Sequence, residues 1–207
     1  MSSAHQQTLF LLLVFGGLAL LAGSVWRNYQ RRLAAWRAFA RRHGWSFRET
    51  LGSMEVEGLY QGQQLSLLTE QRGSGKSRYT VAVVRLDVSH ALPVELSLEP
   101  ETLGDRFLKL VGKRDEELGD AALDEAFDLK RLSPDARAVL RAPRVARPLL
   151  RLPRLFSRFS IEGGLLEVEQ RGVPETPEGL EALVAPVLEL ADALGVVAAT
   201  PEEQMRG

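Results

Sequence analysis

The chain has 207 residues, with 26 Lys and Arg, 27 Asp and Glu, three His and no Cys. An apolar content of 45% and a charged content of 26% are those of an average folded protein, so a chain that is disordered throughout is excluded. The absence of Cys excludes disulfides, thiolate metal sites, thiol catalysis and a lipoprotein anchor on a lipidated Cys.

The formal net charge of −1 conceals a segmented chain. Residues 27–48 and residues 136–161 each hold seven Arg and no acid. Residues 49–135 hold 10 basic and 17 acidic residues, a net of −7, and residues 162–207 hold 2 basic and 10 acidic residues, a net of −8. The charges of the separate segments are a better guide than the overall charge to which segments attract one another or an outside partner.

The first predicted element is a single transmembrane helix within residues 1–26. Residues 8–25 contain no charged side chain and seven Leu, and as a helix they would span about 27 Å, close to the ~30 Å hydrocarbon core of a bilayer. No Lys or Arg precedes this segment, whereas six Arg follow it between residues 27 and 42. The positive-inside rule therefore predicts a single-pass protein of the inner (cytoplasmic) membrane, with the N-terminus outside and the C-terminal domain in the cytoplasm.

A cleaved secretory signal peptide is the alternative for this segment. Ala22-Gly23-Ser24 is an acceptable cleavage site, and cleavage there would release a periplasmic domain. The basic region that precedes the apolar core of a signal peptide is missing, and the Arg cluster after the segment opposes translocation. The anchor is therefore the favoured interpretation.

Residues 27–44 predict a basic juxtamembrane helix, because Tyr29, Leu33, Trp36 and Ala40 recur at helical spacing. From Trp45 the pattern changes to short alternating or β-branched runs that are typical of strands. Gln61-Gly62 is a tight-turn signal between two of them. The short links predict a mainly antiparallel sheet, with strands at residues 45–48, 54–60, 63–70, 79–88 and 93–98.

The next segment predicts helices and an acidic loop. Residues 101–111 have a helical apolar pattern, and the acidic residues 113–128 are interpreted as a solvated loop. Ser133-Pro134 is a good helix start, opening a helix to residue 142. Pro143, Pro148 and Pro153 then predict that the following segment is broken into short pieces.

The C-terminal part predicts a second hairpin and a final helix. Strands at residues 156–161 and 165–170 flank Glu162-Gly163-Gly164, a turn signal. Thr176-Pro177 begins a helix that Pro186 should kink and Gly195 should end, and residues 197–207 are expected to form a flexible tail.

Gly73-Ser74-Gly75-Lys76-Ser77 resembles the end of a phosphate-binding P-loop. The first Gly of that motif would stand at position 70, which is Glu70, and a carboxylate there would repel phosphate. A strand rather than a helix is predicted to follow, so no helix N-terminus faces the loop. The segment therefore predicts a hairpin loop and not a nucleotide site.

Asp87 and His90 are the only catalytic candidates, because Asp87 could orient the imidazole for acid–base work. They lie at the end of a predicted strand, where polar residues also mark turns. His5, His43 and His90 are too scattered along the chain for a metal site, and neither a metal nor a cofactor is expected. A non-enzymatic protein is favoured, with an enzyme that acts at the membrane surface as the alternative.

A stripe of arginines is the strongest candidate contact surface. The spacings of 4, 3, 3, 4, 3 and 4 place these arginines on one helical face, although the prolines between them fold the stripe into a patch. Anionic lipid headgroups, an unknown protein partner and the acidic segments of the chain itself are candidate partners, and nucleic acid is the least favoured. Because the anchor already holds the domain at a surface, the stripe is expected to dock the domain on the cytoplasmic leaflet. The members of the stripe are Arg137, Arg141, Arg144, Arg147, Arg151, Arg154 and Arg158.

Residues 120–170 resemble a family of uncharacterised bacterial membrane-anchored proteins that carry a domain of unknown function. The resemblance rests on Asp124-Glu125-Ala126-Phe127-Asp128, the Arg-rich helix after Ser133-Pro134 and the turn at Gly163-Gly164, together with the N-terminal anchor. It implies a membrane-tethered domain, and it implies no activity and no catalytic residue.

These observations predict an α+β protein, in which one transmembrane helix precedes a single domain with a mainly antiparallel sheet and helices on one face. The expected parts are the anchor (residues 1–26), the juxtamembrane helix (27–44), the cytoplasmic domain (45–196) and the tail (197–207). The expected function is a binding or scaffolding module at the cytoplasmic membrane surface.

Overall fold

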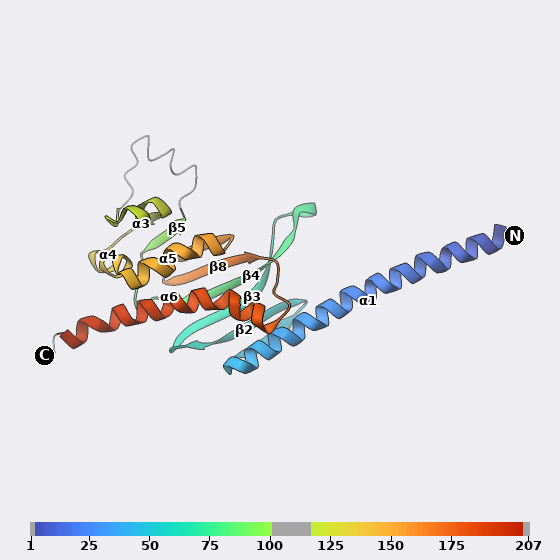
Figure 1. The fold of residues 1–207 in the computed structure, drawn as a ribbon, viewed down its shortest axis with the longest axis horizontal. Coiled ribbons are helices and arrows are strands. Elements are labelled where there is room, and N and C mark those ends of the chain that lie inside the picture. Colours follow the sequence, from blue (N-terminus) through green and yellow to red (C-terminus); the bar gives the residue numbers. More distant parts are fainter. Residues whose placement is uncertain (1–2, 101–116, 205–207) are drawn as a thin grey trace, which may run out of the picture.

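The structure is a computed structural model that describes residues 3–100 and 117–204, and the side chains of residues 3–15, 19 and 198–204 lie outside this description. It is an α+β fold in which eight strands form one antiparallel sheet, with helices packed against the sheet (Figure 1). The side chains along the central strands show which face the helices cover. Ala82, Val84 and Leu86 belong to the hydrophobic core, whereas Arg85 and Asp87, which point to the opposite face, are partly exposed.

The strand order in the sheet is β1-β2-β3-β4-β8-β7-β5-β6, and every pair of neighbours is antiparallel. The first four strands form a meander, and the β7–β8 hairpin joins it through β8. The predicted antiparallel sheet is therefore confirmed. The strands are β1 (Ser46–Thr50), β2 (Ser53–Tyr60), β3 (Gln63–Arg72), β4 (Tyr79–Asp87), β5 (Ser97–Pro100), β6 (Phe127–Lys130), β7 (Arg158–Glu162) and β8 (Leu165–Arg171).

Both predicted hairpins are confirmed, and their turns have the backbone conformation that their sequences favour. Gln61 and Gly62 have φ values of 51° and 83°, and Gly163 and Gly164 have values of 63° and 75°. Two consecutive positive φ values indicate a type I′ turn, which matches the twist of the flanking strands. A Cβ at Gly164 would also lie 2.8 Å from the Cβ of Ser89, so this glycine is required by space as well as by conformation.

Helix α1 (Ser3–His43) is a single helix of 41 residues, and its C-terminal part belongs to the core of the domain. Trp36 and Phe39 are completely buried, and Leu33 is 4% exposed. The indole Nε1 of Trp36 donates a hydrogen bond to the carbonyl oxygen of Pro174 at 3.2 Å. The predicted apolar stripe of the juxtamembrane helix therefore faces the domain.

Ion pairs add to the attachment of α1 to helix α6 (Pro177–Gln204) and to the segment that precedes it. Arg32 Nη2 lies 2.5 Å from Glu175 Oε1, and Arg42 Nη1 lies 3.3 Å from Glu181 Oε1. His43 Nε2 also lies 2.9 Å from Glu181 Oε1. These side chains are partly exposed, so solvent screening limits each pair to about 0–1 kcal/mol, and the buried aromatic side chains dominate the attachment.

The predicted break occurs at Pro143, where one helix ends and the next begins, but the prediction is wrong at Pro148 and Pro153. Helix α4 (Pro134–Arg141) ends at Ala142, and helix α5 (Pro143–Leu155) continues through Pro148 and Pro153. Each internal proline removes one backbone hydrogen bond. The buried face of α5, which consists of Val145, Ala146, Pro148, Leu149 and Leu152, packs against the core and offsets this cost.

The acidic segment before α4 is ordered structure within the described residues, and not the loop that was predicted. Helix α3 (Ala121–Ala126) leads directly into β6. Asp120 Oδ1 accepts hydrogen bonds from the backbone N–H groups of Ala122 and Leu123, and Asp124 accepts from that of Leu118 at 2.6 Å. These carboxylates therefore cap backbone groups. The predicted helix at residues 101–111 lies outside the described residues.

Helix α6 continues through Pro186 and past Gly195 to Gln204, so the prediction that Gly195 ends it is wrong. Gly195 lies inside the helix with a negative φ, and the helical hydrogen bonds simply continue through it. Leu183, Val187, Leu190 and Leu194 are buried on the core side of α6. This packing explains why the helix needs no stop at a residue of low helix propensity.

Within the part of the chain that the structure describes, no helix combines the length and the apolar character needed to span a bilayer. The predicted anchor includes residues 8–15, whose side chains lie outside that part. The anchor therefore stays a prediction.

The buried aromatic contact of α1 makes a direct prediction about stability. Replacing Phe39 with Ala should lower the free energy of unfolding by about 3–5 kcal/mol, because the side chain is fully buried and leaves a cavity. Leu59→Ala is the control, since Leu59 is 62% exposed and should cost less than about 0.5 kcal/mol. Guanidinium unfolding of the full chain in detergent measures both, and equal costs would contradict the placement of α1 in the core.

Candidate binding surfaces

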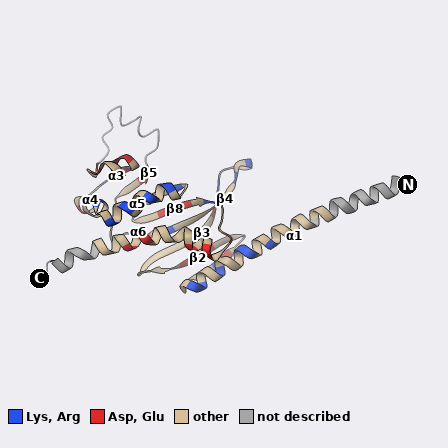
Figure 2. Ribbon diagram, in the orientation of Figure 1, with Lys and Arg blue, Asp and Glu red and all other residues tan. Residues whose placement is uncertain are grey.

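The predicted arginine stripe lies mostly on α4 and α5. Arg144, Arg147, Arg151 and Arg154 recur on one side of α5, opposite its buried residues, and all four are exposed. Arg137 and Arg141 are exposed residues of α4. We call these six residues the arginine face (Figure 2).

Among the described residues, one member of the arginine face has an ion pair. Arg151 Nη1 lies 2.7 Å from Glu189 Oε2 of α6, and both side chains are about half exposed. The other acidic side chains at the start of α6, Glu178 and Glu181, pair instead with Arg42 of α1. The acidic C-terminal block therefore neutralises α1 more than it neutralises the arginine face, which is left available to an outside anion.

Arg158, the seventh predicted member, does not belong to this face. It is the first residue of β7, where the side chains alternate between the two faces of the sheet. Phe159 and Ile161 enter the core below the helices, so Arg158 points to the opposite face. The spacing of Arg158 fitted a helix, but the chain had already changed to the two-residue period of a strand.

The face of the sheet that the core does not use carries a network of five charged residues across three strands. Arg85 of β4 donates from Nη2 to Glu70 Oε1 at 2.8 Å and from Nε to Glu167 Oε2 at 2.7 Å. Arg72 of β3 donates from Nε to Glu169 Oε2 at 2.8 Å and lies 2.5 Å from Glu70 Oε2. These hydrogen bonds raise the pKa of Arg72, foremost through Glu169. The network stabilises the sheet, and its charged groups pair with one another.

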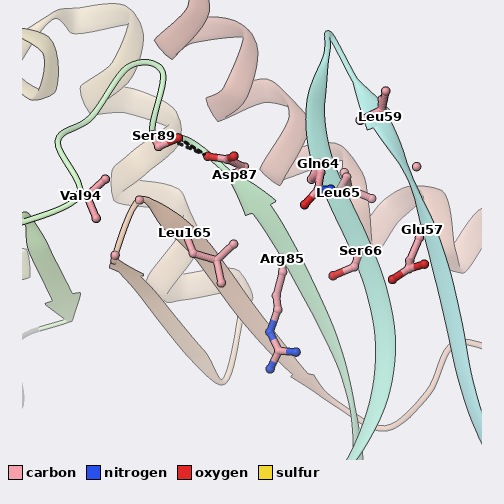
Figure 3. A pocket seen from close by; sticks show the side chains of 13 residues that line it. Glu57, Leu59, Gln64, Leu65, Ser66, Arg85, Asp87, Ser89, Val94 and Leu165 are labelled. Atoms are coloured by element: carbon pink, nitrogen blue, oxygen red, sulfur yellow. Dashed lines mark hydrogen bonds between the residues drawn. The ribbon is translucent and has the colours of Figure 1, made fainter.

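A trough of about 740 Å³ crosses the same face of the sheet (Figure 3). Its lining combines the polar groups of Glu57, Ser66, Arg85 and Asp87 with apolar side chains such as Leu165. Glu57 pairs with Arg48, and Arg85 belongs to the charged network. The trough is wide and open, and its charged groups are already paired or hydrogen-bonded, so its lining indicates no particular ligand.

The two catalytic candidates face different concavities. Asp87 lines the trough and accepts hydrogen bonds from Ser89 Oγ at 2.6 Å and from Ser89 N at 2.9 Å (Figure 3). These two bonds lower the pKa of Asp87, which makes its carboxylate a weaker base. His90 is exposed and lines a separate concavity beside Tyr60 and Asp192. The charge of the neighbouring His90 also lowers the pKa of Asp87, but the hydrogen bonds of Asp87 among the described contacts close a turn and do not join it to His90.

A polar contact beside His90 links β2 to α6. Tyr60 Oη donates to Asp192 Oδ1 at 2.7 Å, and Gln61 Nε2 donates to the same oxygen at 2.8 Å. Partial burial and the Asp192 carboxylate raise the pKa of Tyr60 to about 12. Tyr60 therefore stays protonated at physiological pH and acts as a donor.

The residues that the sequence missed are those of the charged network, Arg72 and Arg85 with their three Glu partners. A sequence signal for them exists, since charged residues recur at every second position late in β3 and in β8. Which acid pairs with which arginine depended on strand order, because β4 and β8 are far apart in the chain.

The described residues contain no group of three or more His, Asp or Glu that could hold a metal ion. No family model, curated protein or solved structure matches the chain. The resemblance over residues 120–170 therefore stays a prediction.

The contact between Tyr60 and Asp192 predicts a pH dependence of stability. Since the folded-state pKa of Tyr60 lies above its ordinary value of 10, its contribution is fully present below pH 10 and is lost as the pH rises toward 12. Tyr60→Phe should cost about 0.5–1.5 kcal/mol at pH 8, and this difference from wild type should shrink at pH values above 10.

Denaturant unfolding of the full chain at constant ionic strength, at pH 8 and near pH 11, measures this difference. Gln61→Asn weakens the second bond to Asp192 but keeps Tyr60, so it should follow the pH dependence of the wild type. A difference between Tyr60→Phe and wild type that does not change with pH would contradict the assignment.

Proposed function

We propose that the protein is a membrane-tethered binding module, in which the N-terminal part of α1 crosses the cytoplasmic membrane and the arginine face binds an acidic protein surface in the cytoplasm. The observation that carries the proposal is the arginine face itself. It presents six exposed arginines on two consecutive helices, and one of them has an ion pair within the described part of the chain.

The tether is supported by the uncharged residues 8–25 and by the arginines that follow them. It is supported further by the continuity of α1, since one helix of about 60 Å would hold both the membrane segment and the buried Trp36 and Phe39. A tether of this kind fixes the orientation of the domain, because no flexible linker separates the two parts.

The direction of α5 favours a protein partner over the bilayer for the arginine face. Arg32 and Arg42 of α1 contact Glu175 and Glu181 in the same order, so α1 and α6 run in the same direction. In Figure 1, α5 lies beside α6 along that common direction. If α1 crosses a bilayer, a surface on α5 then stands upright beside the membrane and does not lie flat on it.

Arginine suits such a contact, because its planar guanidinium forms paired hydrogen bonds with carboxylates and loses hydration readily. Nucleic acid remains the weaker candidate, since aromatic side chains are scarce among these arginines and the rest of the chain is acidic. An enzyme is also less favoured, because Asp87 and His90 line different concavities.

The proposed tether predicts the membrane topology of the protein. A C-terminal fluorescent-protein fusion should be fluorescent in a bacterial host, and a C-terminal alkaline phosphatase fusion should be inactive, because the positive flank retains the domain in the cytoplasm. An active phosphatase fusion would instead support the periplasmic domain released at Ala22-Gly23-Ser24 and would refute the proposed orientation.

The arginine face predicts a specific adduct. With a photo-crosslinking amino acid at position 147 of the full-length protein in native membranes, irradiation should give a discrete protein adduct. The double variant R141E/R144E should lose at least 90% of that adduct, because it changes the charge of the face by −4. Gel mobility and mass spectrometry of the adduct are the measurements.

The matched control is R41E/R48E, which also changes the charge by −4 but alters exposed residues of α1 and β1 outside the arginine face, and it should keep the adduct. Adducts with lipid alone at position 147 would show that the arginine face rests on the bilayer. Equal loss in both variants would show a general charge effect. Either outcome would refute the protein contact.

A further inference from the structure

One end of the domain lies on the side toward which the N-terminal part of α1 extends. The β1–β2 turn reaches α1 there, where Tyr29 Oη donates a hydrogen bond to Glu49. The segment after β8 reaches α1 at the same end, through the contacts of Glu175 with Arg32 and of Pro174 with Trp36. In Figure 1 the β3–β4 hairpin extends from the sheet on this side. We call this part of the molecule the hairpin end.

The tip of the β3–β4 hairpin is basic and exposed. Lys76 lies in the short helical turn Gly75–Ser77, and Arg78 follows it directly. All residues from Gly73 to Tyr79 are exposed, and neither Lys76 nor Arg78 has an ion pair within the described residues. The P-loop-like sequence therefore forms a loop that presents two free cations.

A second basic group lies at the base of this hairpin, on the face of the sheet opposite the core. Arg72, Arg158 and Arg171 line a concavity of about 540 Å³ together with Tyr79 and Glu169. Glu169 is 5% exposed, and its carboxylate is occupied by Arg72. Arg171 lies over the ring of Tyr79 at 4.4 Å, and Arg158 is exposed without an ion pair in the described part. Two guanidinium groups thus remain open to an outside anion.

Apolar and amphipathic side chains accompany these cations. Leu51, at the β1–β2 turn, is fully exposed, and Tyr79 is 37% exposed. Trp26 of α1, which is 64% exposed, follows the uncharged segment. Exposed Leu, Tyr and Trp beside Lys and Arg are the composition of surfaces that sit at the boundary between headgroups and acyl chains.

We propose that the hairpin end binds the phosphate groups of anionic phospholipids in the cytoplasmic leaflet. Arg158 and Arg171 would hold phosphate oxygens, Lys76 and Arg78 would reach the neighbouring headgroups, and Leu51 would enter the interface. The proposal rests on the proposed tether, because the course of α1 would carry the hairpin end toward the membrane. It assigns lipid to the hairpin end and leaves the arginine face on α4 and α5 to a protein.

The test uses the full-length protein in lipid nanodiscs with a single environment-sensitive fluorophore. The chain has no Cys, so Ser74→Cys gives one labelling site at the hairpin tip, and the Ser74 side chain forms no capping hydrogen bond that the substitution would remove. Glu162→Cys labels the opposite end of the sheet, next to the β7–β8 turn, as the control position. Discs of neutral lipid and discs that also contain phosphatidylglycerol are compared.

The label at position 74 should shift its emission to shorter wavelength in the anionic discs, and the label at position 162 should not. K76Q/R78Q should reduce the ratio of docked to free hairpin about fivefold for each cation removed. R158Q/R171Q should have a similar effect, whereas R144Q/R147Q, with the same loss of charge on the arginine face, should have none.

Three results would overturn the proposal. The emission at position 74 could be the same in neutral and anionic discs, or the shift could survive in K76Q/R78Q and in R158Q/R171Q. Inorganic phosphate alone could also reproduce the full shift, which would make the site one for free phosphate esters. Failure of the protein to co-elute with the discs would instead refute the tether, so the two proposals fail in different measurements.

Discussion

The burial of Trp36 and Phe39 against the domain is the contact on which the rest of the structure depends. Each side chain is completely removed from water, and burying an aromatic side chain of this size contributes about 1.5–3 kcal/mol. Because both belong to α1, the helix that carries the apolar N-terminal segment is also a core element of the domain. The exposed ion pairs with Glu175 and Glu181 select the direction of α6 along α1 and add little energy. Which surface of the domain would face a membrane depends on this attachment.

The fold was predictable where the local preference of the residues, such as that of a tight turn, agrees with the conformation that the tertiary structure requires. The turns at Gln61-Gly62 and Gly163-Gly164 were found because positive φ values at two adjacent positions strongly restrict the residue types. The rules failed where packing outweighed local preference. Pro148 lies inside α5, since the buried face of the helix compensates for the lost hydrogen bond, and α6 passes through Gly195 because its apolar side is already buried. The strand β6 was hidden in an acidic segment, where Leu129 and Phe127 alone face the core.

The candidate site was predictable in part, and the part that failed has a simple geometric cause. Six of the seven arginines lie on exposed positions of α4 and α5, as helical spacing requires. Arg158 continues the spacing along the chain but begins a strand, and the change of period sends its side chain to the other face of the sheet. There it meets Arg171 of the adjacent strand β8 and Arg72 of β3, which is distant in sequence. Sequence periodicity can find a surface within one element, but it cannot join residues that strand order brings together.

The ion pairs show which of the acidic and basic segments that alternate along the chain attract one another. Within the acidic C-terminal block, the acids just before and at the start of α6 pair with α1, whereas those of β8, together with Glu70 of β3, pair with Arg72 and Arg85. Among the described residues, the arginine face and the hairpin end both keep cations without an ion pair, and the two surfaces differ in their surroundings. The arginine face lies on helices without exposed aromatic side chains, whereas the hairpin end combines cations with Leu51 and Tyr79. Guanidinium groups alone can bind a carboxylate surface, whereas binding to a lipid interface is also strengthened by apolar and aromatic side chains. In the proposed arrangement the same excess of positive charge would serve two different partners, and the rigid course of α1 would hold one beside the membrane and the other on it.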